Sequence, residues 1–186
     1  TVAHSLNNYN NLKLIWIDAH ADINTSYSSK TGNIHGMPLG FLTNLDEDEN
    51  FFYIYNHLNF ENIMYIGIRD IDEFEKKVIK HTAVMKTNQF NHNKILDKID
   101  KFVGNSPIHI SLDIDGLDPS YMPSTGTTSE EGLHISPVKG LLDHLYKTKK
   151  RQIKNVDICE FNPKIGTKED VYKTLKNIMH LFDKYI

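Results

Sequence analysis

The sequence predicts an α/β protein with a parallel β-sheet that is covered by helices on both faces. Short runs rich in β-branched and aromatic residues alternate along the chain with amphipathic helical patterns. The strand-like runs are apolar at nearly every position, which is typical of strands buried on both sides. Strands that alternate with helices favour a parallel sheet over an antiparallel one.

Five segments have the pattern of buried strands, and the third is the weakest of them: 12–17, 62–68, 82–86, 108–114 and 154–161. Four segments have helical patterns: 1–9, 91–103, 136–149 and 167–185. Ser136-Pro137 suits the start of the third helix, and Thr167 can cap the fourth. Residues 26–33 and 46–50 are polar and are expected to form exposed connections.

Length and composition favour one soluble domain over residues 1–186, and the sequence has 39% hydrophobic and 24% charged residues. The formal net charge of −3 gives no reason to expect a nucleic acid or a membrane surface as partner. No apolar run approaches the ~18 residues of a membrane span. The single cysteine, Cys159, fits a reducing compartment, so we expect a cytoplasmic protein. The chain opens at Thr1 without an initiator methionine, which suggests that an N-terminal part is lacking.

Metal-binding types of side chain stand at the ends of two predicted strands, where open α/β sheets bind their ligands. Asp18, His20 and Asp22 follow the first strand, and Asp113 and Asp115 end the fourth. Residues two apart in an extended chain face the same way. These side chains therefore converge on one pocket if the two strands are neighbours.

Carboxylates crowded in a buried pocket repel one another unless cations neutralise them. A lone Asp-x-Asp after a strand is more often a turn or a cap, but two such motifs after two strands favour a metal site. Oxygen ligands with some imidazole suit Mn²⁺ or Mg²⁺ better than structural zinc. Two ions roughly 4 Å apart can hold a bridging hydroxide, so the pattern predicts metal-assisted hydrolysis.

The ends of two further strands allow more than one interpretation. Arg69, Asp70, Asp72 and Glu75 follow the second strand and fit either a solvated or ion-paired loop or a substrate site. Glu160 ends what we expect to be an interior strand and suits a bidentate pair with a cationic substrate group. The alternative for it is a buried pair with a structural arginine, a residue type of which the sequence holds few.

Six stretches resemble the arginase branch of the ureohydrolase family, in that family's order and nearly end to end: WIDAHADIN, GNIHGMPLGF, YIGIRDIDEFE, HISLDIDGLDPSYMPSTGT, EEGLHIS and VDICEFNP. The resemblance implies a three-layer α/β/α fold, two Mn²⁺ ions per subunit, and hydrolysis of L-arginine to L-ornithine and urea by a metal-bridging hydroxide. It also implies a homotrimer, with the segment after Asn162 in the subunit contacts.

The resemblance also implies the ligands of the two ions. Asp18 and Asp113 resemble the ligands that bridge both ions. Asp22 resembles a ligand of one ion, while His20 and Asp115 resemble ligands of the other.

Substrate and proton-transfer roles follow from the same resemblance. His35 resembles a proton shuttle near the cleft mouth, and imidazole titrates near neutral pH. Glu160 resembles the carboxylate that orients the guanidinium, Thr127 a nearby pocket residue, and Asp22 is placed to pass a proton to the leaving amine. The positions implied to hold the α-carboxylate and α-amino groups are Asn24, Thr31, Asp72 and Glu75.

The sequence departs from the family at two places. The family carries a Gly-Gly-Asp-His segment upstream whose histidine completes one metal shell, and this chain begins after it; His4 is expected to be structural. The stretch TGTTSEEGL is shorter than in the family. Either the loop is deleted or the numbering joins residues across unobserved segments, and we expect the latter.

Three alternatives to an arginase stay open. They are agmatinase or another ureohydrolase, a catalytically impaired relative, and a phosphotransferase with an aspartyl nucleophile. The last rests on HISLDIDGL alone and leaves IWIDAHAD unexplained.

Overall fold

A five-stranded parallel sheet lies at the centre of the computed structural model, which describes residues 1–85 and 92–185. The strands are β1 (Lys13–Ile17), β2 (Ile63–Ile66), β3 (Ala83–Met85), β4 (Ile108–Asp113) and β5 (Ile153–Cys159). Their order in the sheet is β3-β2-β1-β4-β5.

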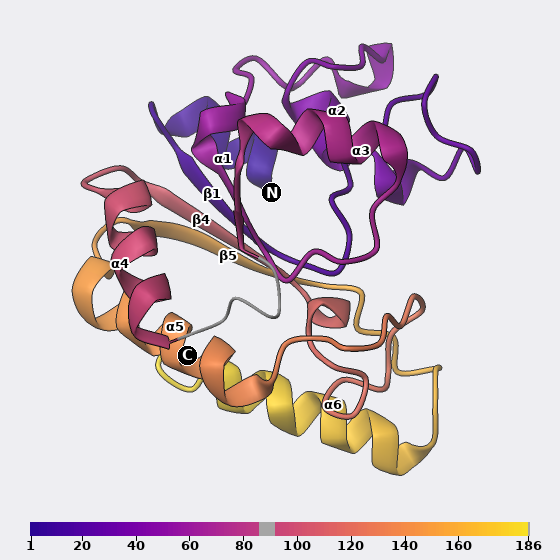
Figure 1. Ribbon diagram of the computed structural model, residues 1–186, viewed down its shortest axis with the longest axis vertical. Coiled ribbons are helices and arrows are strands. Elements are labelled where there is room, and N and C mark those ends of the chain that lie inside the picture. The colour runs from indigo at the N-terminus through magenta and orange to yellow at the C-terminus, as the bar shows by residue number, and fades with distance from the viewer. Residues whose placement is uncertain (86–91, 186) are drawn as a thin grey trace.

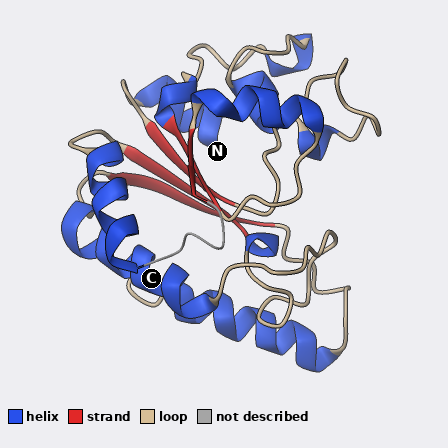
Figure 2. Cartoon of the chain, in the orientation of Figure 1, coloured by secondary structure: helices blue, strands red, loops and turns tan. Residues whose placement is uncertain are grey.

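Helices cover both faces of this sheet, as Figures 1 and 2 show. One layer holds α1 (Val2–Asn8), α2 (Pro38–Leu42) and α3 (Glu73–Val78). The other holds α4 (His92–Val103), α5 (Ile135–Lys149) and α6 (Lys168–Leu181). The predicted three-layer α/β/α class with a parallel sheet is therefore confirmed.

Successive side chains of a central strand point to opposite faces of the sheet, and both faces are covered, which explains why these strands are apolar at nearly every position. Leu14 and Trp16 of β1 pack into the hydrophobic cluster that includes α1 and α2. Ile15 and Ile17 point to the opposite face and join the cluster that includes α4 and α5. Because both faces are covered, each position of β1 after its first residue is buried.

Two expectations about the C-terminal part of the chain are wrong. The last helix ends at Leu181 rather than at residue 185, because Phe182 and Tyr185 turn back to pack on the core. The Tyr185 hydroxyl donates to the Leu142 carbonyl of α5 at 2.7 Å. The predicted interior strand is β5, which lies at the edge of the described sheet, with Ile158 42% exposed.

The other predicted elements appear within a few residues of their expected bounds, and Lys86 and Asn91 lie outside the described residues. Sequence reasoning missed α2 and α3, although Pro38 at the first turn and the Asp72-x-x-Glu75 capping box were signals for them.

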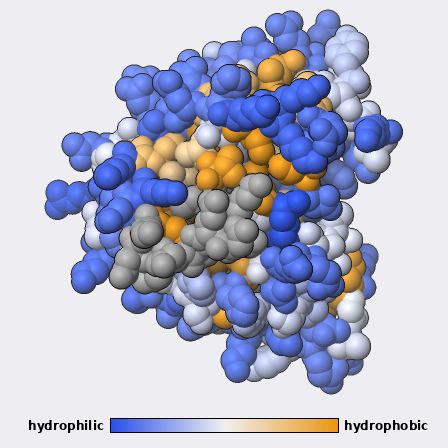
Figure 3. All heavy atoms as spheres, viewed as in Figure 1, coloured by the Kyte–Doolittle hydropathy of each residue, from blue (hydrophilic) through white to orange (hydrophobic). Residues whose placement is uncertain are grey.

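Side chains on the face drawn in Figure 3 are mainly hydrophilic, with hydrophobic residues gathered between the two helical layers. None of the helices that the structure describes is long and apolar enough to cross a membrane.

Candidate metal centre and substrate pocket

The two strands that end in acidic motifs are neighbours in the sheet. β1 pairs with β4 in parallel, with Ile17 opposite Leu112. Asp18, which follows β1, and Asp113, which ends β4, therefore lie at the same edge of the sheet. The sheet order also reverses here, since β2 and β3 lie on one side of β1, and β4 and β5 on the other. This reversal is the point at which open α/β sheets bind ligands.

Asp18, His20 and Asp115 form one compact group of potential metal ligands, in which one ligand atom from each lies within 4.8 Å of the others. His20 Nδ1 lies 3.1 Å from Asp115 Oδ2 and 3.5 Å from Asp18 Oδ1. The main chain fixes both carboxylates, because His20 N donates to Asp18 Oδ1 at 2.7 Å and Ala19 N donates to Asp115 Oδ1 at 3.2 Å.

Charge within this group is unevenly distributed. Hydrogen bonds to Asp115 and Asp18 raise the pKa of His20 to about 11. Burial opposes ionisation of Asp115, but the hydrogen bond and charge of His20 outweigh it and lower the Asp115 pKa. Asp18 is only 1% exposed, and burial raises its pKa well above the ordinary value.

Asp22 and Asp113 lie outside that three-residue group but line the same pocket as His20 and Asp115. Burial, followed by repulsion from Asp18, raises the pKa of Asp22 to about 9. Burial, followed by repulsion from Asp115, raises the pKa of Asp113 to about 8. In the metal-free protein both carboxyl groups therefore hold protons at neutral pH.

A pocket of about 260 Å³ opens beside these carboxyl groups. Its walls include every predicted site residue except Asp18, which is buried beneath it, and Thr31. The predicted residues among its walls are His20, Asp22, Asn24, His35, Asp72, Glu75, Asp113, Asp115, Thr127 and Glu160. Thr31 is exposed in the 26–33 loop, where its Oγ1 accepts from Asn33 N at 3.2 Å.

Asp72 and Glu75 also have structural partners. They form the capping box of α3, in which Asp72 Oδ1 accepts from Glu75 N at 2.9 Å and Glu75 Oε2 from Asp72 N at 3.0 Å. Asn24 Nδ2 donates to Asp72 Oδ2 at 2.9 Å, which links the loop after β1 to the start of α3. The cap thus holds two pocket carboxylates in fixed positions.

Glu160, His35 and Thr127 reach the pocket from three separate connections. Glu160 follows β5 and has φ of 63°, while Asp22 on the facing wall has φ of 50°. Positive φ is uncommon for residues other than glycine and often marks functional positions. Thr127 Oγ1 donates to Asp115 Oδ2 at 3.0 Å, and His35 stands exposed in a single turn at Ile34–Gly36.

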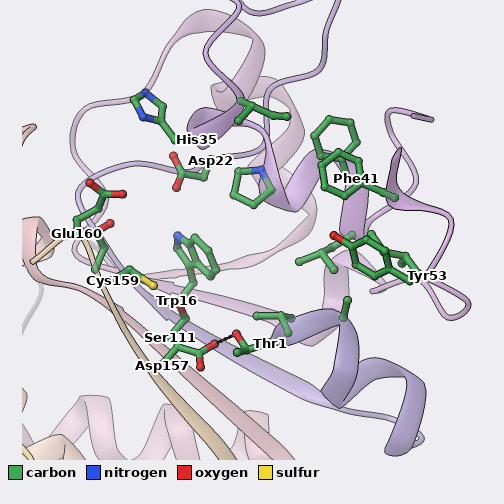
Figure 4. Close-up of a pocket in the computed structure, with 18 residues that line it drawn as sticks. Thr1, Trp16, Asp22, His35, Phe41, Tyr53, Ser111, Asp157, Cys159 and Glu160 are labelled. Atoms are coloured by element: carbon green, nitrogen blue, oxygen red, sulfur yellow. Dashed lines mark hydrogen bonds between the residues drawn. The ribbon is translucent and has the colours of Figure 1, made fainter. Parts of the chain in front are cut away.

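A second, mainly apolar pocket of about 410 Å³ adjoins the first and shares Asp22, His35, Asp113 and Glu160 with it. Figure 4 shows His35, Asp22 and Glu160 at one end of this pocket and Trp16 below Asp22. Within residues 1–85 and 92–185, the buried Trp16 Nε1 has no hydrogen-bond partner.

The connection through TGTTSEEGL lies between β4 and α5 and includes the exposed residues 126–128. Leu117 and Leu133 form a parallel bridge at its end, and Gly132 lies against residues 117 and 118 so closely that a Cβ would be 2.3 Å from Asp118 N. These contacts bring the end of the loop back to the segment after β4.

Sequence reasoning also missed residues that hold the acidic motifs in place. Tyr65 of β2, fully buried, donates its hydroxyl to Ala21 O at 2.8 Å between His20 and Asp22. Gly116 lies against the main chain of Asp18. In the sequence Tyr65 and Gly116 do not differ from ordinary core residues, and only their contacts in the folded protein show that they hold the acidic motifs.

Replacing Gly116 by alanine is expected to destabilise the fold by about 1–3 kcal/mol, because the added Cβ would lie 2.9 Å from both N and Cα of Asp18. Urea denaturation of the metal-free protein measures this change. Gly126→Ala is the matched control, since its Cβ would meet only Ile165 Cδ1, at 3.9 Å. Equal midpoints for the two variants would contradict the expected close contact.

The sequence model of the arginase family matches residues 1–182. The chain belongs to the arginase family. It is 40% identical to the arginase of Plasmodium berghei over 176 residues, which are 88% of this chain and 49% of that protein. It is 35% identical to arginase-1 of Bos taurus over 178 residues, 88% of this chain and 55% of the relative. The chain thus spans about half the length of these curated relatives.

Solved arginase structures have the same fold. The Entamoeba histolytica arginase in complex with L-ornithine is 31% identical, with a TM-score of 0.88 over 98% of this chain and 64% of that one. An arginase structure from Bacillus subtilis gives the same identity, coverage and TM-score. Membership of the arginase family confirms the resemblance seen in the motifs and argues against the phosphotransferase alternative.

Proposed function

We propose that this arginase-family protein hydrolyses L-arginine to L-ornithine and urea with two Mn²⁺ ions. The observation that carries the proposal is the cluster of carboxylates and one imidazole at the carboxyl ends of β1 and β4. The related Entamoeba histolytica arginase was crystallised with L-ornithine, the amino-acid product of the proposed reaction.

The residues at this cluster fit a manganese centre. Asp18 Oδ2 is buried and has no hydrogen-bond partner among the described residues, and such an atom is costly unless a cation is bound to it. The donors are mainly carboxylate oxygens, which suit Mn²⁺. We propose that Asp18 and Asp113 would hold both ions, His20 and Asp115 one of them, and Asp22 the other. Bound Mn²⁺ lowers the pKa of water and so supplies a nucleophile at neutral pH.

Glu160 is proposed to hold the substrate guanidinium against this centre. A carboxylate and a guanidinium pair bidentately, which fixes the plane of the substrate group. Glu160 and Asp113 line both pockets, which supports a guanidinium between them, and Thr127 supports the position of Asp115 through its hydrogen bond. This orientation directs the guanidinium carbon toward the ligand cluster.

Asp22 and His35 are proposed to move the protons. The Asp22 carboxyl oxygen is the group that passes a proton to the leaving amine nitrogen of ornithine, and it lines the pocket wall. His35 stands at the solvent side, where its ring nitrogens exchange protons with bulk water.

The amino-acid end of the substrate is proposed to bind Asn24, Thr31, Asp72 and Glu75. The carboxylates of Asp72 and Glu75 attract an ammonium, and the amide of Asn24 and hydroxyl of Thr31 can donate to a carboxylate. Three of the four line the pocket, while Thr31 would have to approach it from the neighbouring loop.

We also propose a cytoplasmic homotrimer that acts in arginine metabolism. Support for subunit contacts comes from the part of the chain after Asn162, where α6 exposes Tyr172, Leu175 and Met179 at helical spacing.

Urea release from arginine and from agmatine, with Mn²⁺ added, tests the proposed substrate. Agmatine lacks the carboxylate, so donors built for that group stay unpaired, and we expect at least about a 10²-fold preference for arginine in kcat/KM. A preference for agmatine would support the agmatinase alternative. Bound Mn²⁺ without urea from either compound would indicate a catalytically impaired relative.

A further inference from the structure

Arg69 uses all of its side-chain donors on main-chain carbonyl groups. Nε donates to Glu130 O at 2.8 Å, and Nη1 donates to Gly67 O and Gly116 O, both at 3.2 Å. Nη2 donates to Asp115 O at 2.8 Å and to Ser129 O at 2.6 Å. A guanidinium has five N–H donors, so none is left for a substrate.

These carbonyl groups belong to three segments near the same edge of the sheet. Gly67 follows β2, Asp115 and Gly116 follow β4, and residues 129–130 lie in the middle of TGTTSEEGL, further along the same connection between β4 and α5. The main chain of Arg69 adds a fourth, since Arg69 N and Asp70 N donate to Ala19 O at 2.8 and 3.1 Å. One residue therefore joins the segment that holds Asp18 and His20 to the segment that holds Asp115.

The side chain does not take part in the pocket itself. Arg69 is absent from the residues that line either pocket around the ligand cluster, and the ion pairs within 4.0 Å described for the chain do not include it. Arg69 therefore belongs neither to an ion-paired loop nor to a substrate site, the two interpretations that the sequence allowed for the residues after the second strand.

We propose that Arg69 is a positioning residue that sets the distance between Asp115 and the Asp18–His20 segment for metal binding. This inference rests on the proposed manganese centre. Asp115 O and Asp115 Oδ1 are both held, the first by Arg69 and the second by Ala19 N, so the carboxylate cannot turn independently of the β1 connection. The partly buried positive charge also offsets the neighbouring carboxylates.

Arg69→Lys separates geometry from charge. Lysine keeps the charge but has three donors on one atom and no planar fork, so it cannot bond to all three segments at once. We expect Mn²⁺ affinity, measured by titration calorimetry on the purified protein, to fall about 10–100-fold, as for other groups that orient metal ligands. Arg151→Lys is the matched control, because Arg151 is exposed before β5, and it should bind Mn²⁺ like the wild type.

Hydrogen exchange of the metal-free proteins gives a readout that needs neither metal nor activity. In Arg69→Lys, peptides that span 113–118 and 129–133 should exchange faster than in the wild type, while peptides from α5 stay unchanged. If that variant unfolds, Arg69→Gln, which keeps two donors, takes its place in both measurements.

Unchanged Mn²⁺ affinity together with unchanged exchange in the variant would overturn the positioning role. An equal loss of affinity in Arg69→Lys and Arg151→Lys would overturn it as well. A wild-type protein that binds no Mn²⁺ would refute the proposed metal centre instead, and the exchange measurement would still decide whether Arg69 holds the connections.

Discussion

Replacing Asp113 by alanine is expected to abolish both Mn²⁺ binding and urea release. Asp113 ends β4 beside the connection of β1, and in the proposed centre it contacts both ions. Losing a direct ligand of both ions should cost more than the about 10–100-fold that the loss of an outer group costs. Titration calorimetry with Mn²⁺ and a urea assay measure the two effects.

Two controls separate this loss from unfolding. Asp97→Ala removes an exposed carboxylate of α4 and should leave Mn²⁺ binding and turnover unchanged. The metal-free Asp113→Ala protein should stay folded at pH 8, because losing a buried carboxyl group whose pKa is raised to about 8 offsets the loss of the hydrogen bond that Asp115 N donates to Asp113 Oδ1 at 3.0 Å. Normal arginine turnover by the variant would rule out the assignment of Asp113.

The site residues that lie close together in the sequence could be predicted, because open α/β sheets bind their ligands at the carboxyl ends of the strands. Asp18 and His20 follow an apolar run, and their spacing of two already places them on one side of the chain. Their approach to Asp115 needed one further fact, that β1 and β4 are adjacent, which no property of either strand encodes. The resemblance to the arginase family predicted that these residues share one metal site, which the periodicity of the apolar residues could not show.

Contacts between distant segments were not predictable in the same way. Arg69 bonds to carbonyl groups as far away as Glu130, and a carbonyl is present whatever the residue type, so the sequence bears no mark of the partnership. The edge position of β5 depends on the topology of the whole sheet. The family motif implied that Thr31 binds the amino-acid end of the substrate. Its exposed position could not be predicted, because it depends on the conformation of residues 26–33.

Without metal, the protein is expected to lose stability as the pH rises from about 5 to about 9. Asp22 and Asp113 have folded pKa values of about 9 and about 8, against an ordinary 3.8, so between these values the folded state binds more protons than the unfolded state. The free energy of unfolding must then fall with rising pH. His20, raised from 6.5 to about 11, adds a loss in the same direction above pH 6.5.

Asp115 is the only member of the cluster whose pKa shift acts in the opposite sense, and its lowered pKa matters only at acid pH, below the ordinary 3.8. Since a change of 1 kcal/mol moves the melting temperature of a protein of this size by about 2–4 °C, a net loss of a few kcal/mol should lower it by about 10 °C. Scanning calorimetry in metal-free buffer between pH 5 and 9 measures this decline. The double variant Asp22→Asn/Asp113→Asn should show a smaller decline, most clearly between pH 5 and 6.5, and His20 should still contribute a loss above pH 6.5.

Mn²⁺ should reverse the trend, because the same carboxyl groups must lose their protons to bind it and its affinity therefore increases with pH. At a free concentration 100 times the dissociation constant, the ion adds about 2.7 kcal/mol of stability. The melting temperature with Mn²⁺ should thus exceed the metal-free value most at pH 8 to 9 and least near pH 5. A metal-free melting temperature that stays constant or rises over this range would show that the buried carboxyl groups do not hold their protons as described, and the case for a cation as their neutraliser would fall with it.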